Sequence, residues 1–100
     1  MGRFDEHVRA ALDSLPPEIA RALESVAVVV EDENPEDPDL LGLFQEEPYL
    51  PAKISIYRRP LEESFPDRRE LEEEIRITVL HELAHYFGID EDRLGELGYE

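Results

Sequence analysis

The chain has 100 residues, of which 26 are acidic and 10 are basic, so its formal net charge is -16. Such a charge repels phosphate backbones and anionic lipid surfaces, which argues against a nucleic-acid-binding protein and against a membrane-binding one. Cysteine is absent, so disulfides and thiolate metal sites are excluded, and a transition-metal site must use histidine and carboxylate ligands.

The first part of the chain is predicted to form two helices and a strand. Apolar residues recur at helical spacing over residues 3–14 and predict an amphipathic helix, and a second helix is expected from Pro17 to about Leu23, with proline in its first turn. Residues 25–31 (SVAVVVE) are rich in β-branched side chains and predict a buried strand. The acidic, proline-containing residues 32–39 are expected to form an exposed loop.

The second part is predicted to contain a strand and the longest helix. Residues 40–51 are apolar without clear periodicity, which fits either a short strand or a packed loop. Residues 54–59 (ISIYRR) alternate as a half-exposed strand does, and we expect an edge strand that ends at Pro60. Apolar residues at steps of four predict a helix from Pro66 or Asp67 to Phe87, ended by Gly88. Asp90 is expected to cap a final short turn.

These elements predict an α+β fold in which a small β-sheet packs on a long helix, with additional short helices. No repeat or low-complexity tract interrupts the sequence, so we expect a single domain over residues 1–100 with a thin core. The N-terminal sequence MGRFDEHVRA lacks the basic start and apolar run of a signal peptide, and no stretch approaches the roughly 20 apolar residues of a membrane span. A cytoplasmic protein is therefore expected.

The long helix carries a polar strip on an otherwise apolar stretch. His81, Glu82 and His85 interrupt a run of apolar residues from Ile77 to Phe87, and each buried polar group must find a partner. Histidines four residues apart lie on one helical face, so their imidazoles can converge on one zinc ion, with Glu82 beside it as a general base. The alternative is a pair of histidines that only form hydrogen bonds in a core.

The stretch HELAHYFGIDEDRLGELGY resembles the minimal zincin-like metallopeptidases of small bacterial proteins, whose pattern is HExxHxxGxxD with an acidic, leucine-rich tail. The similarity extends back through RELEEEIRITVL and ISIYRRPLEE, and it is looser in the N-terminal half. The resemblance implies a zincin-like domain with zinc as cofactor. It further implies that His81 and His85 bind the zinc, that Glu82 is the general base and that Gly88 makes the turn.

One position departs from the family pattern. The aspartate that acts as the third zinc ligand in the family falls on Glu91, and Asp92 is the neighbouring alternative. We assign Glu91 as the ligand. No methionine follows Met1, so the turn that metzincins place beneath the metal has no equivalent. Tyr99 is a candidate to stabilise an oxyanion through its hydroxyl, and packing on nearby leucines is the alternative for it.

Two functions fit these residues. The first is a zinc-dependent peptidase acting on peptide or protein substrates, with an extended substrate paired along residues 54–59 and with basic or neutral peptides favoured by the negative charge. So small a domain builds no deep cleft, so we expect a partner, a homodimer or a very restricted substrate. The second is a non-catalytic zincin-fold binding or regulatory module that holds metal weakly or not at all. His7, on the first helix, is expected to have a surface role.

Overall fold

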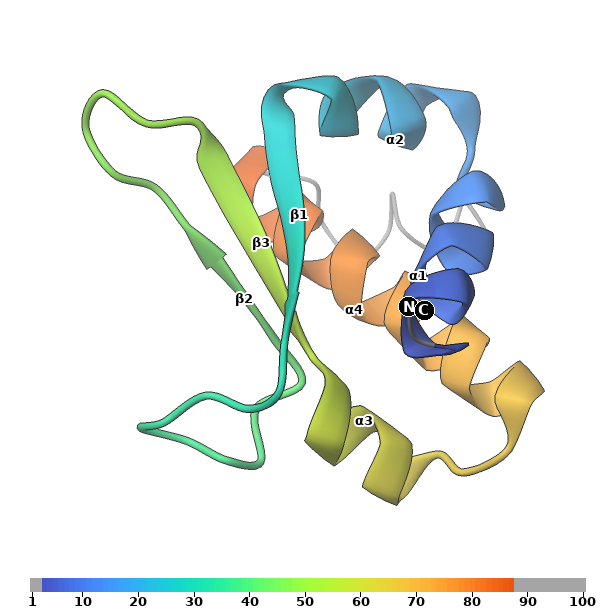
Figure 1. The fold of residues 1–100 in the computed structure, drawn as a ribbon. Helices are drawn as coiled ribbons and strands as arrows, with labels where there is room; N and C mark the ends of the chain where they lie inside the picture. Colours follow the sequence, from blue (N-terminus) through green and yellow to red (C-terminus); the bar gives the residue numbers. More distant parts are fainter. Residues whose placement is uncertain (1–2, 88–100) are drawn as a thin grey trace.

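The computed structural model describes residues 3–87, and side chains as far as Ala84 (Figure 1). This part of the chain is α+β, as predicted, with helices and a mixed three-stranded sheet. In chain order the elements are α1 (Arg3–Asp13), α2 (Pro17–Ala22), the 3-10 turn η1 (Leu23–Ser25), β1 (Val26–Glu31), β2 (Gly42–Gln45), β3 (Ala52–Tyr57), α3 (Arg58–Ser64) and α4 (Arg68–Phe87). None of the described helices is long and apolar enough to cross a membrane. The turns predicted at Gly88 and Asp90 lie outside the described residues.

The sheet has the strand order β1-β3-β2. Strand β3 pairs in parallel with β1, where Ile54 lies opposite Val28, and antiparallel with β2, where Ile54 lies opposite Phe44. The strand that we predicted at residues 54–59 is therefore central, and its assignment as an edge strand was wrong. The alternation of apolar and polar residues suggested that the polar side chains face solvent. Ser55 is instead fully buried, and its hydroxyl donates a hydrogen bond to Glu31 Oε2 at 2.8 Å.

The two edge strands are β1 and β2. Strand β1 was predicted to be buried, but only Val26 is buried there, and the other residues of the strand are partly or fully exposed. The β-branched run predicted the strand correctly but not its burial, because branched side chains suit an edge strand as well as a central one. Residues 42–45 form a strand, which decides between the two alternatives for residues 40–51.

The core lies between the sheet and the helices, with α1 and α4 packed against each other beside the sheet (Figure 1). Helix α4 supplies the largest share of it, and β3 supplies two residues that are completely buried. The buried core side chains of these two elements are Leu71, Ile75, Val79, Leu80, Leu83, Ala84, Ile54 and Ile56. Burial of this stripe stabilises α4, because most helical stability in proteins comes from packing of the apolar face.

Helix α4 begins where the sequence predicted. The Asp67 side chain accepts a hydrogen bond from the Glu70 N–H at 3.1 Å, and the Asp67 carbonyl accepts one from the Leu71 N–H at 2.8 Å, as at a helix N-cap. Helix α3 was not predicted, because Pro60 was taken as the end of a strand. Proline is equally compatible with the first turn of a helix, and Pro60 occupies that place.

Arg58, the first residue of α3, holds the end of β1 against this helix. Its guanidinium donates to Asp32 Oδ1 at 3.0 and 3.1 Å and to Glu62 Oε1 at 2.7 Å. The hydrogen bonds to Asp32 and then to Glu62 raise the pKa of Arg58 above its ordinary value, so these contacts are those of a permanently charged side chain.

Candidate functional site

The second half of α4 has the predicted division into a buried face and a polar strip, but the expectation that the polar groups of the strip are buried was wrong for His81. Val79, Leu80 and Leu83 are completely buried, whereas His81 is exposed and Glu82 is half-buried. The helix is therefore anchored by its apolar face, and it presents His81 and Glu82 where other groups can reach them.

The carboxylate of Glu82 is held by the edge strand β2. The backbone N–H of Phe44 donates to Glu82 Oε1 at 2.9 Å, across 38 residues of sequence. The carbonyl of Leu41 accepts a hydrogen bond from the Tyr57 N–H at 3.0 Å, so the backbone groups of Leu41 point towards β3. Backbone groups point to alternate sides along a strand, so those of Gly42 and Phe44 point away from β3, to the outer side of β2. Glu82 thus reaches the open edge of the sheet.

Strand β2 comes this close to α4 because residue 42 is glycine. A Cβ atom at Gly42 would lie 2.5 Å from Thr78 Cγ2 and 3.2 Å from the Ser55 carbonyl oxygen. Any side chain at residue 42 would therefore displace the strand or the helix. A glycine within a strand is a known sign of close backbone approach. That signal was present in LLGLF and we did not use it in the sequence prediction.

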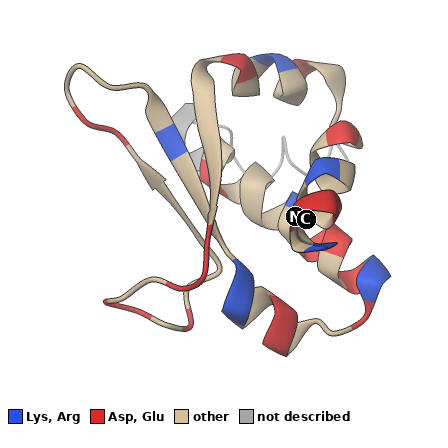
Figure 2. Ribbon diagram, viewed as in Figure 1, with Lys and Arg blue, Asp and Glu red and all other residues tan. Residues whose placement is uncertain are grey.

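A cleft of about 350 Å³ lies beside this contact. Its walls come from the end of the acidic loop, from the start of β2 and from α4. The lining residues are Asp37, Asp39, Leu40, Leu41, Gly42, Thr78, His81 and Glu82. Figure 2 shows that acidic residues gather on the loop between β1 and β2. Asp37, Asp39 and Glu82 give the cleft negative charge, and none of the described residues that line it is lysine or arginine.

The predicted metal ligands are described only in part. Helix α4 is continuous through His85, so His81 and His85 are one helical turn apart, but the side chain of His85 and the whole of Glu91, Asp92 and Tyr99 lie outside the described side chains. Among the side chains described, no group of three histidine, aspartate or glutamate residues could hold a metal. The donor set of two imidazoles and a carboxylate suits zinc, and the exposed His81 leaves its imidazole accessible, so these residues fit that metal.

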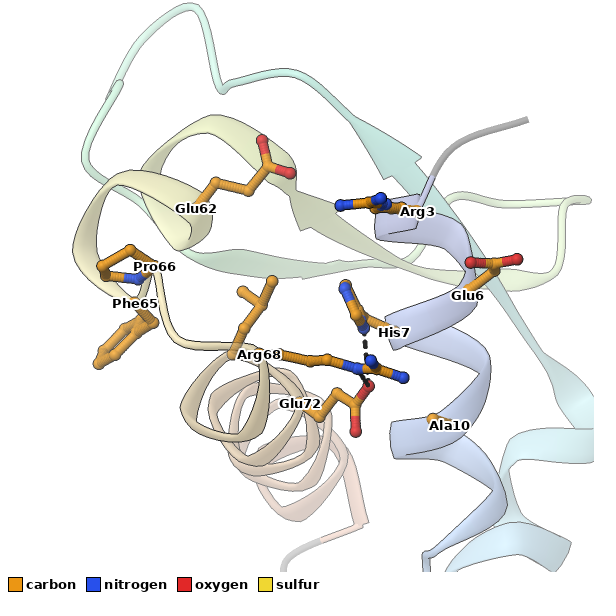
Figure 3. Close-up of a pocket in the computed structure, with 10 residues that line it drawn as sticks. Arg3, Glu6, His7, Ala10, Glu62, Phe65, Pro66, Arg68 and Glu72 are labelled. Carbon is orange, nitrogen blue, oxygen red and sulfur yellow. Dashed lines mark hydrogen bonds and ion pairs between the residues drawn. The ribbon is translucent and has the colours of Figure 1, made fainter.

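The expectation of a surface role for His7 was wrong. Its side chain is 14% exposed, and Nδ1 lies 2.7 Å from Glu72 Oε2, so His7 links α1 to α4. Figure 3 shows this pair at the side of a second cavity of about 630 Å³, which Arg3 and Arg68 also line. This cavity lies at the N-terminal end of α4, away from His81.

Comparison with known proteins identifies the family of the chain. The model of a family described as zincin-like metallopeptidase matches residues 23–99, which extends the similarity further towards the N-terminus than the quoted motifs do. No curated protein matches the chain. Since the match includes β1, β2, β3 and the whole of α4, the chain belongs to the zincin-like metallopeptidase family.

Proposed function

We propose that the chain is a zinc-dependent peptidase with Glu82 as its general base. The observation that supports this most directly is the 2.9 Å hydrogen bond from the Phe44 N–H to Glu82 Oε1, beside the exposed His81. It fixes a carboxylate at the border between a cleft and an open strand edge, where a peptide can approach.

The metal ligands in this proposal are His81, His85 and Glu91, with Asp92 as the alternative to Glu91. Zinc, when bound, supplies a Lewis acid that polarises the substrate carbonyl and lowers the pKa of water. Glutamate in place of the family's aspartate keeps the carboxylate and lengthens the side chain by one methylene.

Glu82 moves the proton. Its Oε1 is engaged by the Phe44 N–H, so Oε2 is the oxygen that accepts the proton of the attacking water. Glu82 then donates the proton to the nitrogen of the leaving amine, which leaves the carboxylate ionised for the next cycle. The hydrogen bond to β2 keeps the carboxylate in one orientation through both transfers.

The substrate pairs with β2 rather than with residues 54–59, because β3 is central and its two sides are occupied. Gly42 is buried and the Phe44 N–H is engaged by Glu82, so the extended peptide adds along the exposed residues that begin at Gln45. Asp37 and Asp39 line the cleft next to this edge, so their charge favours basic over acidic substrate side chains.

A peptide-library digest with the zinc-loaded protein tests the proposal. We expect cleavage by the wild type, none by Glu82→Gln, and equal zinc content and fold for both, because the amide is nearly isosteric but does not accept the proton. Glu63→Gln, which removes one charge from the exposed side of α3, is the matched control and should cleave as the wild type does. Identical cleavage by wild type and Glu82→Gln would exclude Glu82 as the base.

A second candidate is the non-catalytic binding or regulatory module. The departure at Glu91 favours it, because a longer ligand side chain alters the metal geometry that catalysis requires. In the same digest, a wild type that retains zinc and cleaves no library peptide would support the binding module over the peptidase.

A further inference from the structure

The hairpin that joins β2 to β3 ends in a strained turn. The Leu50 N–H donates to the Glu47 carbonyl at 3.2 Å, Pro48 follows Glu47, and Tyr49 has a φ of 71°. Proline at the second position and positive φ at the third are features of a type II turn, in which glycine normally occupies the third position. Among the described residues, Tyr49 is the only non-glycine residue with positive φ.

The hydrogen bond and the proline favour the turn, but no packing of the Tyr49 side chain within the described fold offsets the cost of its positive φ. The Tyr49 side chain is fully exposed, at 103%, and that of Leu50 is 61% exposed, whereas most other large apolar side chains of the described chain are at least partly buried. A glycine at residue 49 would relieve the backbone strain and remove an aromatic ring from water. Strain that persists without a local gain is a pointer to function.

The turn lies at the far end of the strand that carries the Glu82 contact. In Figure 1 the hairpin extends away from the helices, at the upper left, and its tip continues the line of β2. Tyr49 lies five residues after Phe44 in the sequence, which at about 3.4 Å per residue is at most about 17 Å of chain. A peptide paired with β2 and positioned at Glu82 therefore reaches the tip with roughly five further residues.

We propose that Tyr49 and Leu50 form a docking site for a distal segment of the substrate, outside the cleft. This proposal rests on the peptidase function proposed above. The tip is apolar, and the exposed carboxylates of Glu46 and Glu47 precede it, so the segment that fits is an apolar residue next to lysine or arginine. Such contacts add binding free energy without taking part in the reaction.

The test compares two sets of peptides that share a core cleaved in the library digest. The short peptide carries three residues on each side of the cleaved bond, and the long peptides carry in addition a Leu-Arg pair five residues beyond it, at either end. We expect one long peptide to have a KM roughly tenfold lower than the short one for the wild type, with kcat unchanged, since burial of one apolar side chain has an effect of this order.

Variants of Tyr49 separate docking from folding. In Tyr49→Gly the KM advantage of the long peptide should disappear while the Tm is at least as high as that of the wild type, because glycine accepts positive φ. Tyr49→Phe should keep the advantage, and so should Val30→Thr, which changes an exposed apolar residue on the opposite edge strand.

Equal KM values for all the peptides with the wild type, or an advantage that survives Tyr49→Gly, would overturn the docking site while leaving the peptidase intact. Absence of cleavage of every peptide would refute the peptidase, and this proposal with it.

Discussion

The close approach of β2 to α4 at Gly42 predicts a specific cost for Gly42→Ala. The new Cβ would lie 2.5 Å from Thr78 Cγ2, about 1 Å short of an ordinary carbon–carbon contact of roughly 3.5–4.0 Å. Thr78 is buried on α4, and its hydroxyl donates to the Glu74 carbonyl at 2.7 Å, so the methyl group cannot rotate away without loss of that bond. The strand and the helix must therefore separate.

The magnitude follows from two opposing effects. Overpacking of this kind costs about 1–3 kcal/mol, and the reduced entropy of the unfolded chain on Gly→Ala returns about 0.4–1 kcal/mol. We expect a net loss of about 1–2 kcal/mol in the free energy of unfolding, or about 4–16 °C in Tm for a domain of this size. Urea and thermal denaturation followed by circular dichroism measure both quantities.

Thr78→Ser gives the decisive control. Serine keeps the hydroxyl that donates to Glu74 and removes the methyl that meets the new Cβ. Alone it should cost about 1 kcal/mol for a deleted buried methyl. Combined with Gly42→Ala it should restore stability close to that of the wild type, because the new Cβ fills the space of the deleted methyl, which corresponds to a coupling free energy of about 2–3 kcal/mol. A Gly42→Ala variant as stable as the wild type, or a double variant in which the two effects simply add, would refute the steric argument.

The remaining predictions concern the metal ligands and the core. Isothermal titration calorimetry should give one zinc per chain for the wild type and none for His81→Ala, and stoichiometric zinc retained by a variant lacking both His81 and His85 would disprove the metal assignment. By the same measurement Glu91→Ala should weaken zinc binding much more than Asp92→Ala. If Asp92 only supports a ligand, the loss of affinity in Asp92→Ala should stay within about 10- to 100-fold. Equal losses of affinity in the two variants would contradict the choice of Glu91. Leu80→Ala should lower the free energy of unfolding by about 2–5 kcal/mol, because Leu80 is completely buried, and a loss below 1 kcal/mol in denaturant titrations would contradict its place in the core.

The helices were predictable because their signals are local. The apolar spacing along α1 and α4 repeats within one or two turns, and Asp67 caps α4 through atoms only three and four residues away. The placement of His81 and Glu82 on one polar strip follows from the same periodicity. Helix α3 escaped prediction because Pro60 is compatible both with a strand end and with a first helical turn.

The sheet order was not predictable in this way, because it depends on contacts between distant segments. Residues 54–57 have the alternation of a half-exposed strand, and only the pairing of β3 with both β1 and β2 buries Ser55. The contact between Phe44 and Glu82 spans 38 residues and involves a backbone N–H, which leaves no trace in side-chain patterns. The role of Glu91 stays a prediction, since it lies outside the described residues.

Where strand β2 meets α4, Gly42 lies against Thr78 and the Phe44 N–H donates to Glu82. From residue 42 to residue 44 the strand advances by about 6.8 Å, and from residue 78 to residue 82 the helix advances by about 6.0 Å, so the two contacts are about equally far apart on both elements. Insertion or deletion of one residue between Gly42 and Phe44 would turn the N–H that now meets Glu82 towards β3. The segment between Gly42 and Phe44 therefore has a fixed length. The loops on either side, residues 32–39 and 46–51, can change in length. Relatives or engineered variants with new substrate preferences should differ in these loops.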